Sequence, residues 1–503
     1  MSAAMPLSAP GLSLSDLVVE LRRVQARLAS GHVVSITDVR HDSRRIEPGD
    51  LFVARPGGKL DGARFVSEAV ARGAIAVLAA EGTPLPDVAV PVVRVSDVRL
   101  ALALASEAVH GHPSSRLDVV GITGTNGKTT TSFLVAEAID ATGGATARLG
   151  TLGYAFGGDS VDESLTTPEA DDVSRFASRA LARGASHLAM EVSSIALTQA
   201  RVDAVKFAVG ALTNVTQDHL DYHGSMEAYA SAKARLFEEL SPGVAVINVD
   251  DPVGAAIADR VKGRVLRVGR GTHADVRPLA VRLTGKGIEG EVTLPSGIVR
   301  LASQLVGAHN LDNLLLTLGI VEALGLDTTR AAAGLDRAAA APGRLERCSG
   351  EADDITVLVD YAHTPDALRR VLEAVRGLTH GGVHCVFGCG GDRDPKKRPK
   401  MGAAAGAAAT RVTITSDNPR SEDPAAIAAA IELGLWGAGA PYDLILDRHT
   451  AIENAILSAA PGDLVLIAGK GHEPYQIIGS EKRAFDDRVE ARRALAKRRG
   501  ETT

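Results

Sequence analysis

The chain has 503 residues, a formal net charge of −6 at pH 7, 45% hydrophobic residues and 23% charged residues. This length suits about two to four domains of ordinary size, and the acidic balance argues against a general nucleic-acid binder. The three cysteines provide neither a disulfide framework nor a pair at metal-ligand spacing, so we expect reduced thiols in a cytoplasmic protein. No uncharged apolar run reaches membrane-spanning length, and the first residues lack the basic segment of a signal peptide.

The first part of the chain, from residue 13 to about residue 113, is predicted to be a small α/β unit. Strands are expected over residues 33–36, 51–54, 75–78 and 91–95, and helices over 17–28, 65–72 and 101–109. Ser15 stands where it can cap the first helix. The polar loops at 42–44 and 57–62 can bind an anion, although surface loops are polar by default.

A strand, a glycine-spaced turn and a helix are predicted over residues 117–141. The turn, Thr123 to Lys128, presents backbone N–H groups and the positive end of the helix to an anion, and Lys128 adds a charge. The hydroxyl of Thr129 stands where such loops hold Mg²⁺. The glycine spacing departs by one residue from the usual pattern, and a Gly-rich turn is also a purely structural device. Because strand, turn and helix agree, phosphate binding is the favoured interpretation.

Strands and helices continue to alternate after this loop. Strands are expected over residues 187–192, 205–212 and 244–249, and helices over 170–183, 226–240 and 314–324. The segment 338–344, which contains the pair Pro342-Gly343, is expected to be a domain boundary. After it, strands are expected over 355–361, 383–388, 412–416, 443–446 and 464–468. We therefore predict three α/β domains with mostly parallel sheets, over residues 1–113, 114–342 and 343–503, the last a doubly wound, Rossmann-like sheet. Ligands are expected at the carboxyl ends of the strands.

Polar residues at those strand ends suggest a metal site. Mg²⁺ takes oxygen ligands together with water and substrate phosphates, and Thr129 and Glu191 meet that demand if their strand ends are neighbours. His219 can serve a second ion. Taken singly, each is better explained as a solvated or internally satisfied side chain. Together, beside a phosphate loop, they favour metal binding.

The run Asp417-Asn418-Pro419-Arg420 sets a carboxylate, an amide and a guanidinium around one rigid turn. An arginine fork suits a carboxylate, so the run can hold an amino-acid-like ligand. An ordinary turn is the alternative, and the residues alone favour it. The basic run 396–400 is interpreted as a solvated surface.

These motifs, in this order, resemble the Mur ligase family of peptidoglycan synthesis over about residues 30–490. Thr123 to Thr129 matches the family's phosphate loop, Thr-Gly-Thr-x-Gly-Lys-Thr, and Asp417 to Arg420 is similar to the motif of members that add diaminopimelate. The resemblance implies an ATP-dependent, ADP-forming ligase that uses Mg²⁺. It would join diaminopimelate to UDP-N-acetylmuramoyl-L-alanyl-D-glutamate (the UDP-muramoyl dipeptide) through an acyl phosphate. The first domain would bind the UDP end, the second ATP and the third the amino acid. We expect a cytoplasmic monomer with no nucleic-acid partner.

The resemblance also assigns the site residues. ATP contacts fall on Gly124, Thr125, Asn126, Gly127, Lys128, Thr129, Thr130, Asn310, Arg344, Asp360 and His363. Contacts with the UDP-muramoyl dipeptide fall on Ser43, the loop 58–60, Thr166, Thr167, Ser193, Gln199 and Arg201. Diaminopimelate contacts fall on Arg393, Asp417, Asn418, Pro419, Arg420, Gly469 and Glu473. The metal site falls on Thr129, Glu191, His219 and Lys233, and the catalytic group is Lys128, Lys233, Glu191 and His219.

Lys233 matches a lysine that such ligases carry as an N-carbamate. A free lysine, with a pKa of about 10.4, would repel Mg²⁺, whereas a carbamate supplies anionic oxygens. Without the resemblance, a surface lysine in a salt bridge would be the preferred interpretation of Lys233.

Arg420 is expected to pair with the distal carboxylate that diaminopimelate has and lysine lacks. Leaving a buried charge unpaired is costly, so this site would reject lysine. Glu473 is expected to receive an ammonium group.

Two alternatives remain at this point. One is a folylpolyglutamate-type ligase on the same scaffold, against which the Arg420 motif and the separate N-terminal domain argue. The other is a nucleotide-dependent regulatory protein that ligates nothing.

Overall fold

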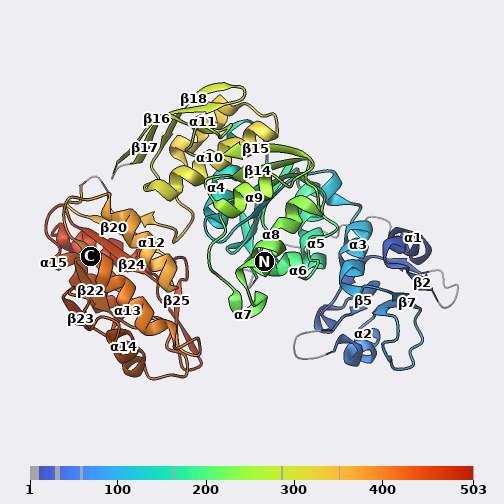
Figure 1. The fold of residues 1–503 in the computed structure, drawn as a ribbon. Helices are drawn as coiled ribbons and strands as arrows, with labels where there is room; N and C mark the ends of the chain where they lie inside the picture. Colours follow the sequence, from blue (N-terminus) through green and yellow to red (C-terminus); the bar gives the residue numbers. More distant parts are fainter. Residues whose placement is uncertain are drawn as a thin grey trace. The chain divides into compact units, whose positions relative to one another are not determined.

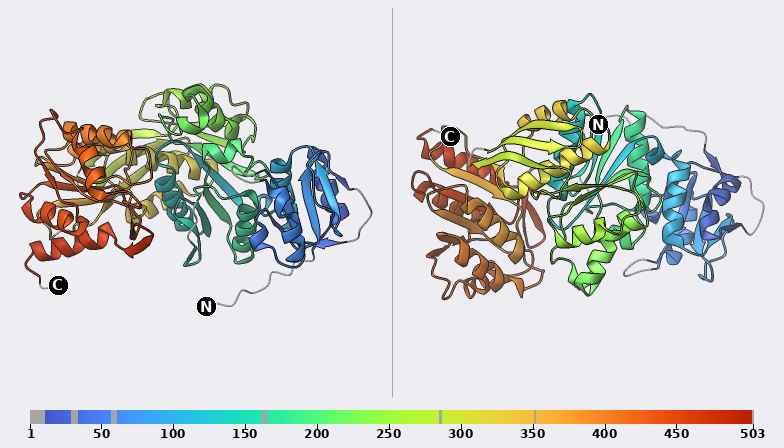
Figure 2. Two further views of the ribbon diagram at one scale, coloured as in Figure 1. Left: turned by 90° about the horizontal axis from the view of Figure 1, so that it is seen from below. Right: turned by 45° about the horizontal axis from the view of Figure 1, so that its top comes forward.

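The computed structural model describes residues 11–28, 34–56, 61–161, 165–284, 287–350 and 352–501. The chain divides into two compact units (Figures 1 and 2). The first comprises Met1–Leu279, Val292–Val299 and Asp312–Leu335, and the second Ala280–Glu291, Arg300–Leu311 and Asp336–Thr503. The domain boundaries expected near residues 113 and 342 stay predictions. Among the described residues, no helix is both long and apolar enough to cross a membrane.

The N-terminal part of the first unit is a five-stranded sheet in the order β2-β7-β6-β5-β4. Its strands are β2 (Arg27–Leu28), β4 (Asp38–Arg40), β5 (Asp50–Ala54), β6 (Ala76–Ala80) and β7 (Val92–Val95), and all pairs but β2–β7 are parallel. Leu51 and Val53 face helices α1 (Leu14–Glu20) and α3 (Val98–Val109). Phe52 and Ala54 face α2 (Val66–Ala71) on the other side. The strand period of two thus buries both faces.

The prediction of a helix over residues 17–28 is wrong at both ends. Helix α1 starts earlier, at Leu14, and its N-cap is Ser13, whose side chain accepts a hydrogen bond from the Asp16 backbone; Ser15 is not the cap. The α-helix ends at Glu20, a 3₁₀ turn covers Leu21–Val24, and Gln25 turns left-handed with φ of 52°. The apolar spacing continues through the 3₁₀ turn, so periodicity alone does not reveal this end. Residue 33 lies outside the described residues; β3 covers Ser35–Ile36 and pairs with β1 (Leu12–Ser13).

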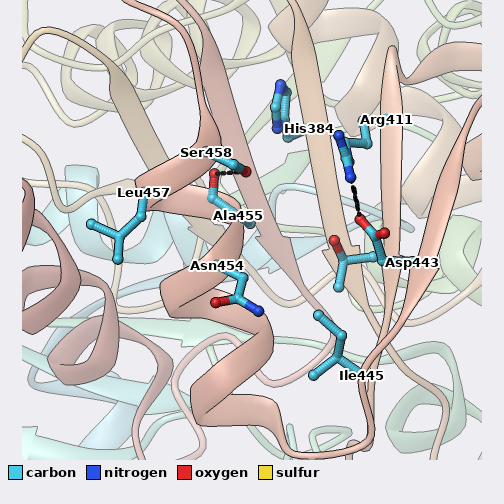
Figure 3. A pocket seen from close by; sticks show the side chains of 9 residues that line it. His384, Arg411, Asp443, Ile445, Asn454, Ala455, Leu457 and Ser458 are labelled. Atoms are coloured by element: carbon cyan, nitrogen blue, oxygen red, sulfur yellow. Dashed lines mark hydrogen bonds and ion pairs between the residues drawn. The ribbon is translucent and has the colours of Figure 1, made fainter.

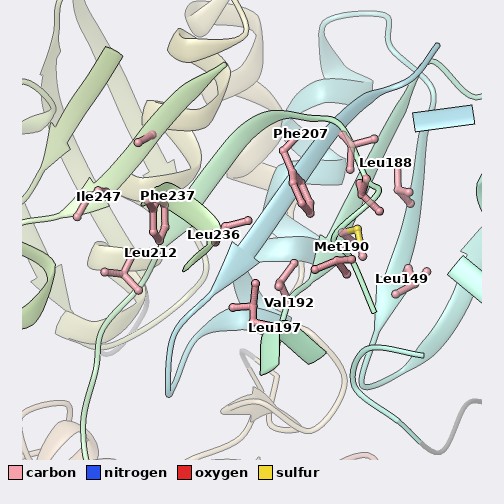
Figure 4. Close-up of a cluster of buried hydrophobic side chains, with 14 of the residues drawn as sticks. Leu149, Leu188, Met190, Val192, Leu197, Phe207, Leu212, Leu236, Phe237 and Ile247 are labelled. Atoms are coloured by element: carbon pink, nitrogen blue, oxygen red, sulfur yellow. The ribbon is translucent and has the colours of Figure 1, made fainter. Parts of the chain in front are cut away.

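The central part is an eight-stranded sheet in the order β11-β10-β9-β12-β8-β13-β14-β15. Its strands are β8 (Asp118–Thr123), β9 (Thr146–Gly150), β10 (Gly153–Phe156), β11 (Asp159–Val161), β12 (His187–Glu191), β13 (Phe207–Leu212), β14 (Val244–Asn248) and β15 (Arg264–Val268). Its helices are α4 (Lys128–Ala141), α5 (Ala170–Ala182), α6 (Ser194–Thr198), α7 (Leu220–His223), α8 (Met226–Glu238) and α9 (Pro252–Ala258). Strands β9, β12, β8, β13, β14 and β15 are parallel, as predicted. Phe207, Met190 and Phe237 belong to the core of this part (Figure 4).

Strand β8 lies between β12 and β13, so the carboxyl ends of all three strands meet at one edge. Ile122 pairs with Glu191 and with Ala211. This register places Glu191 directly beside the start of the phosphate loop.

A three-stranded sheet, β16 (Arg277–Thr284), β17 (Gly287–Leu294) and β18 (Gly297–Ser303), was not expected from the sequence. It is followed by helices α10 (Ala308–Ala323) and α11 (Thr328–Arg337). Helix α10 starts six residues before the expected position at Leu314. Its first turns carry His309, Asn310 and Asn313, whose polar side chains are more typical of a loop or a cap than of a helix interior.

The second unit contains a sheet in the order β19-β20-β24-β21-β22-β23, parallel except for β19. Its strands are β19 (Glu346–Arg347), β20 (Thr356–Asp360), β21 (Val383–Phe387), β22 (Arg411–Ile414), β23 (Tyr442–Leu444) and β24 (Leu464–Ala468). Helices α12 (Pro365–Arg376), α13 (Lys397–Ala408) and α14 (Pro424–Glu432) pack on one face. Helices α15 (Arg448–Ser458) and α16 (Asp487–Arg498) pack on the other, which confirms the doubly wound prediction. A hairpin of β25 (Tyr475–Ile478) and β26 (Glu481–Ala484) follows β24.

The basic run 396–400 opens α13, and the expected solvated surface is wrong for Arg398. Arg398 is buried and pairs with Glu422 at 2.8 Å. Helix formation turns this side of the run inward, which charge spacing alone does not reveal.

Candidate active site

The phosphate loop requires glycine at two positions. Gly124 has φ of +145°, and a Cβ there would lie 1.8 Å from Thr213 Oγ1. Gly127 has φ of +88° and is the N-cap of α4; its Cβ would lie 2.5 Å from Asn313 Oδ1. These glycines let the loop backbone turn tightly before the N-terminus of α4, and the N-terminus of a helix attracts an anion.

The residues that directly follow strand β13 hold the phosphate loop in place. Thr213 Oγ1 donates to the Asn126 carbonyl at 2.6 Å, and the Asn126 N–H donates to Asn214 Oδ1 at 3.1 Å. Lys128 Nζ folds back and donates to the carbonyls of Gly124 and Thr125 at 2.9 and 3.0 Å. The ammonium therefore lies over the loop, where it can meet a phosphate.

Thr129 and Glu191 meet at the edge of the sheet. Thr129 Oγ1 donates to Glu191 Oε2 at 3.0 Å, and the Thr151 N–H donates to Glu191 Oε1 at 2.9 Å. Both Thr129 and Glu191 are buried, with exposures of 5% and 1%. A hydroxyl and a carboxylate are oxygen ligands of the kind Mg²⁺ takes, so the two residues fit this ion. Among the described residues, no group of three or more His, Cys, Asp or Glu side chains is arranged to hold a metal.

Lys233 lies inside the protein rather than on its surface. It is 1% exposed, and its Nζ donates to the Gly124 carbonyl at 2.8 Å. Burial, followed by the nearby charge of Lys128, lowers the pKa of Lys233 well below its ordinary value. The alternative of a surface lysine in a salt bridge is therefore wrong.

His219 and Lys233 contact the same tyrosine. Lys233 Nζ lies 4.5 Å from the centroid of the Tyr229 ring, and the His219 ring lies edge-on to it at 6.4 Å. The Tyr229 hydroxyl lies 3.1 Å from Thr125 Oγ1 in the phosphate loop. His219 itself is exposed, with φ of +50°, and its Nε2 lies 3.5 Å from Asp218 Oδ2. Sequence analysis did not single out Tyr229, because a tyrosine within an amphipathic helix is indistinguishable from ordinary core.

Thr166, Thr167, Ser193, Gln199 and Arg201 are the residues expected to contact the muramoyl-dipeptide part of the substrate, and all but Thr166 form one network. Thr167 Oγ1 donates to the Glu191 carbonyl at 2.8 Å and accepts from the Ser193 N–H at 2.9 Å. Arg201 Nη1 donates to the Thr167 carbonyl at 2.8 Å, and Nη2 donates to Gln199 Oε1 at 2.8 Å. Arg201 is buried, and its Nε has no hydrogen-bond partner in the part of the chain that the structure describes.

The other expected substrate contacts lie around this network or apart from it. Thr166 Oγ1 accepts from Thr151 Oγ1 at 3.2 Å, which ties it to the Glu191 cluster. Ser43 lies in the N-terminal part, where its hydroxyl points to Glu68 Oε2 at 3.4 Å. Residues 58–60 lie outside the described residues.

Residues expected to contact the nucleotide from the second unit surround Tyr361. The Arg344 guanidinium stacks 4.7 Å from the Tyr361 ring centroid, and Arg344 Nε is buried with no hydrogen-bond partner among the described residues. The Asp360 carboxylate accepts from the N–H groups of Leu345 and Ala362, both at 2.8 Å. Burial raises the pKa of Asp360. The His363 ring lies 4.6 Å from the Tyr361 ring.

Asn310 is buried near the start of α10. Its side-chain amide donates to the Val306 carbonyl at 2.9 Å.

The expected amino-acid site lies at the carboxyl ends of β21, β22 and β24. Asn418 Nδ2 donates to Glu473 Oε2 at 2.8 Å, and Arg420 Nη1 donates to the Gly391 carbonyl at 2.7 Å. Gly469 has φ of +116°, and a Cβ there would lie 2.7 Å from Asp417 Oδ2. The Asp417, Asn418, Arg420 and Glu473 side chains therefore gather where parallel sheets bind ligands. Arg393 is exposed, and its Nη1 donates to the Asp392 carbonyl at 3.2 Å.

Three charged residues beneath this site were missed. Lys470 is fully buried beside Asp417 and Glu473, and Arg448 and Asp487 form a fully buried ion pair at 2.7 Å. Lys470 lies two residues after a buried strand and stands between two glycines, which is the one sequence signal that could have drawn attention to it.

A cavity of about 440 Å³ lies elsewhere in the second unit, near the amino ends of β21 and β22 (Figure 3). His384, Arg411, Asp443, Asn454 and Ser458 are among its lining residues. It contains none of the expected site residues. The candidate active site is therefore sought at the carboxyl strand ends, where those residues lie, and not at this cavity.

The fold and the first-unit residues define a phosphate-loop protein of the nucleotide-using α/β class. Sequence profiles described as "Mur ligase family, catalytic domain", "Mur ligase middle domain" and "Mur ligase, glutamate ligase domain" match residues 35–110, 122–321 and 343–471. The chain belongs to the Mur ligase family, which confirms the resemblance drawn from the sequence.

Individual relatives cover nearly the whole chain. A protein of Gloeobacter violaceus named UDP-N-acetylmuramoyl-L-alanyl-D-glutamate--2,6-diaminopimelate ligase is 45% identical over 470 residues, covering 93% of this chain and 95% of its own. A solved structure of a ligase with the same name has a TM-score of 0.69 at 34% identity, covering 92% of this chain and 96% of its own. Mycobacterium tuberculosis folylpolyglutamate synthase, solved with ADP and AMPPCP, has a TM-score of 0.59 at 20% identity and covers 74% of this chain and 92% of its own, a likeness of fold alone.

Proposed function

We propose that this chain joins diaminopimelate to the UDP-muramoyl dipeptide at the expense of ATP, releasing ADP and phosphate. The observation that carries the amino-acid assignment is one connected network in the second unit. The Arg420 N–H donates to the Ile477 carbonyl at 3.1 Å, and the Ile477 N–H donates to Asn418 Oδ1 at 2.9 Å. Asn418 in turn holds Glu473, and the Arg420 guanidinium donates to the Gly391 carbonyl at 2.7 Å, so a guanidinium and a carboxylate are each held at these strand ends. Such a pair suits a ligand that carries both carboxylate and ammonium groups.

The reaction has two chemical steps. The carboxylate of the D-glutamyl residue attacks the γ-phosphorus of ATP, and ADP leaves. The amine of diaminopimelate then attacks the acyl phosphate, loses a proton and expels phosphate, which leaves an amide. In this proposal, Lys128 and the N–H groups at the start of α4 offset charge on the transferring phosphoryl group, which the position of the Lys128 ammonium over the loop supports. Catalysis is thus mainly positioning and electrostatics.

We assign the metal site to Thr129, Glu191, His219 and Lys233. When bound, Mg²⁺ neutralises phosphate charge, and the buried hydroxyl and carboxylate of Thr129 and Glu191 are suited to hold it. Lys233 supports the assignment in another way. A lysine with a lowered pKa is neutral at a lower pH than a free lysine, and only the neutral amine can add to CO₂ and form a carbamate.

Two buried arginines are assigned to the other two ligands, the UDP-muramoyl dipeptide and the nucleotide. Arg201 offers an unpaired buried Nε to an anionic group of the UDP-muramoyl dipeptide, near Thr167 and Ser193. Arg344 offers a second such Nε to the nucleotide. We place the reaction in the cytoplasm, with the protein as a monomer of three domains, over residues 1–113, 114–342 and 343–503.

The proposal is tested by the mass of the product. Protein incubated with ATP, Mg²⁺, the UDP-muramoyl dipeptide and diaminopimelate should yield the dipeptide mass plus diaminopimelate minus one water. Omission of any one component should abolish that product. Hydrolysis of ATP with no new UDP-linked mass would support the regulatory alternative instead.

A further inference from the structure

A fully buried lysine lies under the amino-acid site. Lys470 is 0% exposed, and its Nζ donates to Asn418 Oδ1 at 3.1 Å. The same Nζ lies 3.5 Å from Glu473 Oε2 and 3.8 Å from Asp417 Oδ1. A buried lysine is costly unless its charge is balanced, and here two carboxylates balance it.

Lys470 and the Ile477 N–H together fix which way the Asn418 amide points. Asn418 Oδ1 receives two groups that can only donate, the Lys470 ammonium and the Ile477 N–H. The oxygen must face them, so the NH₂ group faces Glu473 Oε2 at 2.8 Å. Without the lysine, the amide loses one of the two donors that fix this orientation.

Lys470 also reduces the net negative charge of the amino-acid site. Asp417 and Glu473 carry two negative charges between them, and Lys470 offsets one. The neighbouring Arg448 and Asp487 offset each other. In the described part of the chain, the side-chain contacts of Glu473 run through Oε2, which leaves Oε1 for an incoming ammonium group.

We propose that Lys470 is a positioning residue for the amino-acid substrate, which holds Asn418 and Glu473 in the arrangement that receives the ammonium group of diaminopimelate. This inference rests on the proposed function. Lys470 does not touch the reacting atoms and acts through Asn418 and Glu473. Removing it should therefore weaken amino-acid binding more than the use of the other two substrates.

The test compares Lys470→Met with Lys482→Met. Lys482 contacts the same tyrosine as Lys470, with its Nζ 3.7 Å from the Tyr475 ring centroid, but it is exposed and makes a matched control. In Lys470→Met, KM for diaminopimelate should rise by about tenfold or more, because hydrogen bonds to charged groups are lost. KM for ATP and for the UDP-muramoyl dipeptide should stay within about twofold, and Lys482→Met should match wild type.

A double variant tests whether Lys470 acts through Glu473. In a Glu473→Gln background, Lys470→Met should raise KM for diaminopimelate by less than about threefold, because residues in one network do not add independently. Full multiplication of the two effects would overturn the proposal. An unchanged KM for diaminopimelate in Lys470→Met, or an equal rise for all three substrates, would overturn it as well.

Two controls separate the possible failures. If wild type does not use diaminopimelate at all, the proposed function fails and this inference with it; if wild type does, only the inference is at stake. Should Lys470→Met not fold, Lys470→Gln removes the charge but keeps a donor, and the same split among substrates is expected. Loss of folding in both variants would give Lys470 a purely structural role and refute the proposal.

Discussion

Thr129 and Glu191 are in direct contact: Thr129 Oγ1 donates to Glu191 Oε2 at 3.0 Å. Thr129 lies in the first turn of α4 and Glu191 ends β12, so 62 positions of sequence separate two side chains that the sheet brings together. The parallel pairing of β12 with β8 produces this contact, since it places Glu191 opposite Ile122, just before the loop. One buried hydroxyl–carboxylate pair thus lies beside the phosphate loop.

The first prediction concerns this pair. Glu191→Gln keeps the shape of the side chain but removes its charge, so kcat should fall by about a hundredfold or more at saturating ATP. Thr129→Val should act in the same direction. Thr142→Val is the control, because Thr142 lies just beyond the far end of α4 and its hydroxyl donates to the Ile139 carbonyl at 2.7 Å. Wild-type kcat in Glu191→Gln would show that Glu191 has no part in catalysis.

The second prediction concerns CO₂. The lowered pKa of Lys233 favours the neutral amine that a carbamate requires, so activity should fall in CO₂-free buffer and return with bicarbonate. Lys233→Ala should be weakly active and insensitive to bicarbonate. A control variant, Lys206→Ala, alters an exposed lysine and should respond as wild type does. The carbamate can be observed directly by NMR with ¹³C-labelled bicarbonate, and a Lys233→Ala sample that keeps the signal would contradict the assignment.

The third prediction concerns stability and pH. Buried Arg175 on α5 donates to both oxygens of Asp38 on β4, from Nε at 2.8 Å and from Nη2 at 3.0 Å. Burial favours a raised pKa for Asp38, but hydrogen bonds from His110 and Arg175 outweigh it and hold the pKa of Asp38 well below its usual value. A lowered pKa in the folded state stabilises the protein above the unfolded pKa of about 3.9, and this stability is lost as the pH falls through the folded value.

Arg175→Met should therefore cost about 1.5–3 kcal/mol of unfolding free energy at pH 7, because Asp38 loses its hydrogen bonds from Arg175 but keeps Arg40, whose Nη2 lies 2.9 Å from Asp38 Oδ2. The difference from wild type should shrink below about pH 4, where Asp38 of the variant, which accepts fewer hydrogen bonds, becomes protonated. Urea unfolding across this pH range measures both quantities. Arg179→Met, which changes an exposed arginine on the same helix, should behave as wild type does. A pH-independent difference would show that Arg175 stabilises by packing alone.

The fourth prediction concerns the buried pair Arg448–Asp487. Both side chains are 0% exposed, and two hydrogen bonds of 2.7 Å join them. Arg448→Met should destabilise the protein by about 3–5 kcal/mol because Asp487 is left buried and unpaired. Adding Asp487→Leu should recover much of that loss, since an apolar pair needs no counter-charge. Urea unfolding of the two variants decides this, and a double variant no more stable than Arg448→Met would contradict it.

The phosphate loop and the strands nearest to it, β8, β12 and β13, were predictable because these strands are short apolar runs bounded by polar turns, whereas β9 and β15 of the same sheet were not expected. The pattern at residues 117–141 already contains a strand, a turn and a helix, and the structure places them as β8, the loop and α4. Strands β16 to β18 were not predictable in this way. Most residues of β16 are exposed or half-buried, and Leu279 and Leu283 face solvent, so the alternation that indicates a strand is absent.

The candidate site was only partly predictable from the sequence, for a different reason. Motifs quoted from the sequence supply Asp417, Asn418 and Glu473, but the burial of Lys470 depends on contacts with residues far away in the sequence. Lys233 shows the same limit, because its position in an amphipathic helix does not reveal that the Gly124 carbonyl receives its amine. Only the folded structure distinguishes such a lysine from a surface one.

Phosphate release from ATP with different amino acids tests the central claim most directly. Wild-type protein is given Mg²⁺ and the UDP-muramoyl dipeptide, with diaminopimelate, lysine or no amino acid. The account predicts rapid release only with diaminopimelate, because Arg420 needs the distal carboxylate that lysine lacks. Equal release with lysine would contradict the role of Arg420, and release that does not depend on the UDP-muramoyl dipeptide would contradict the ligase assignment itself.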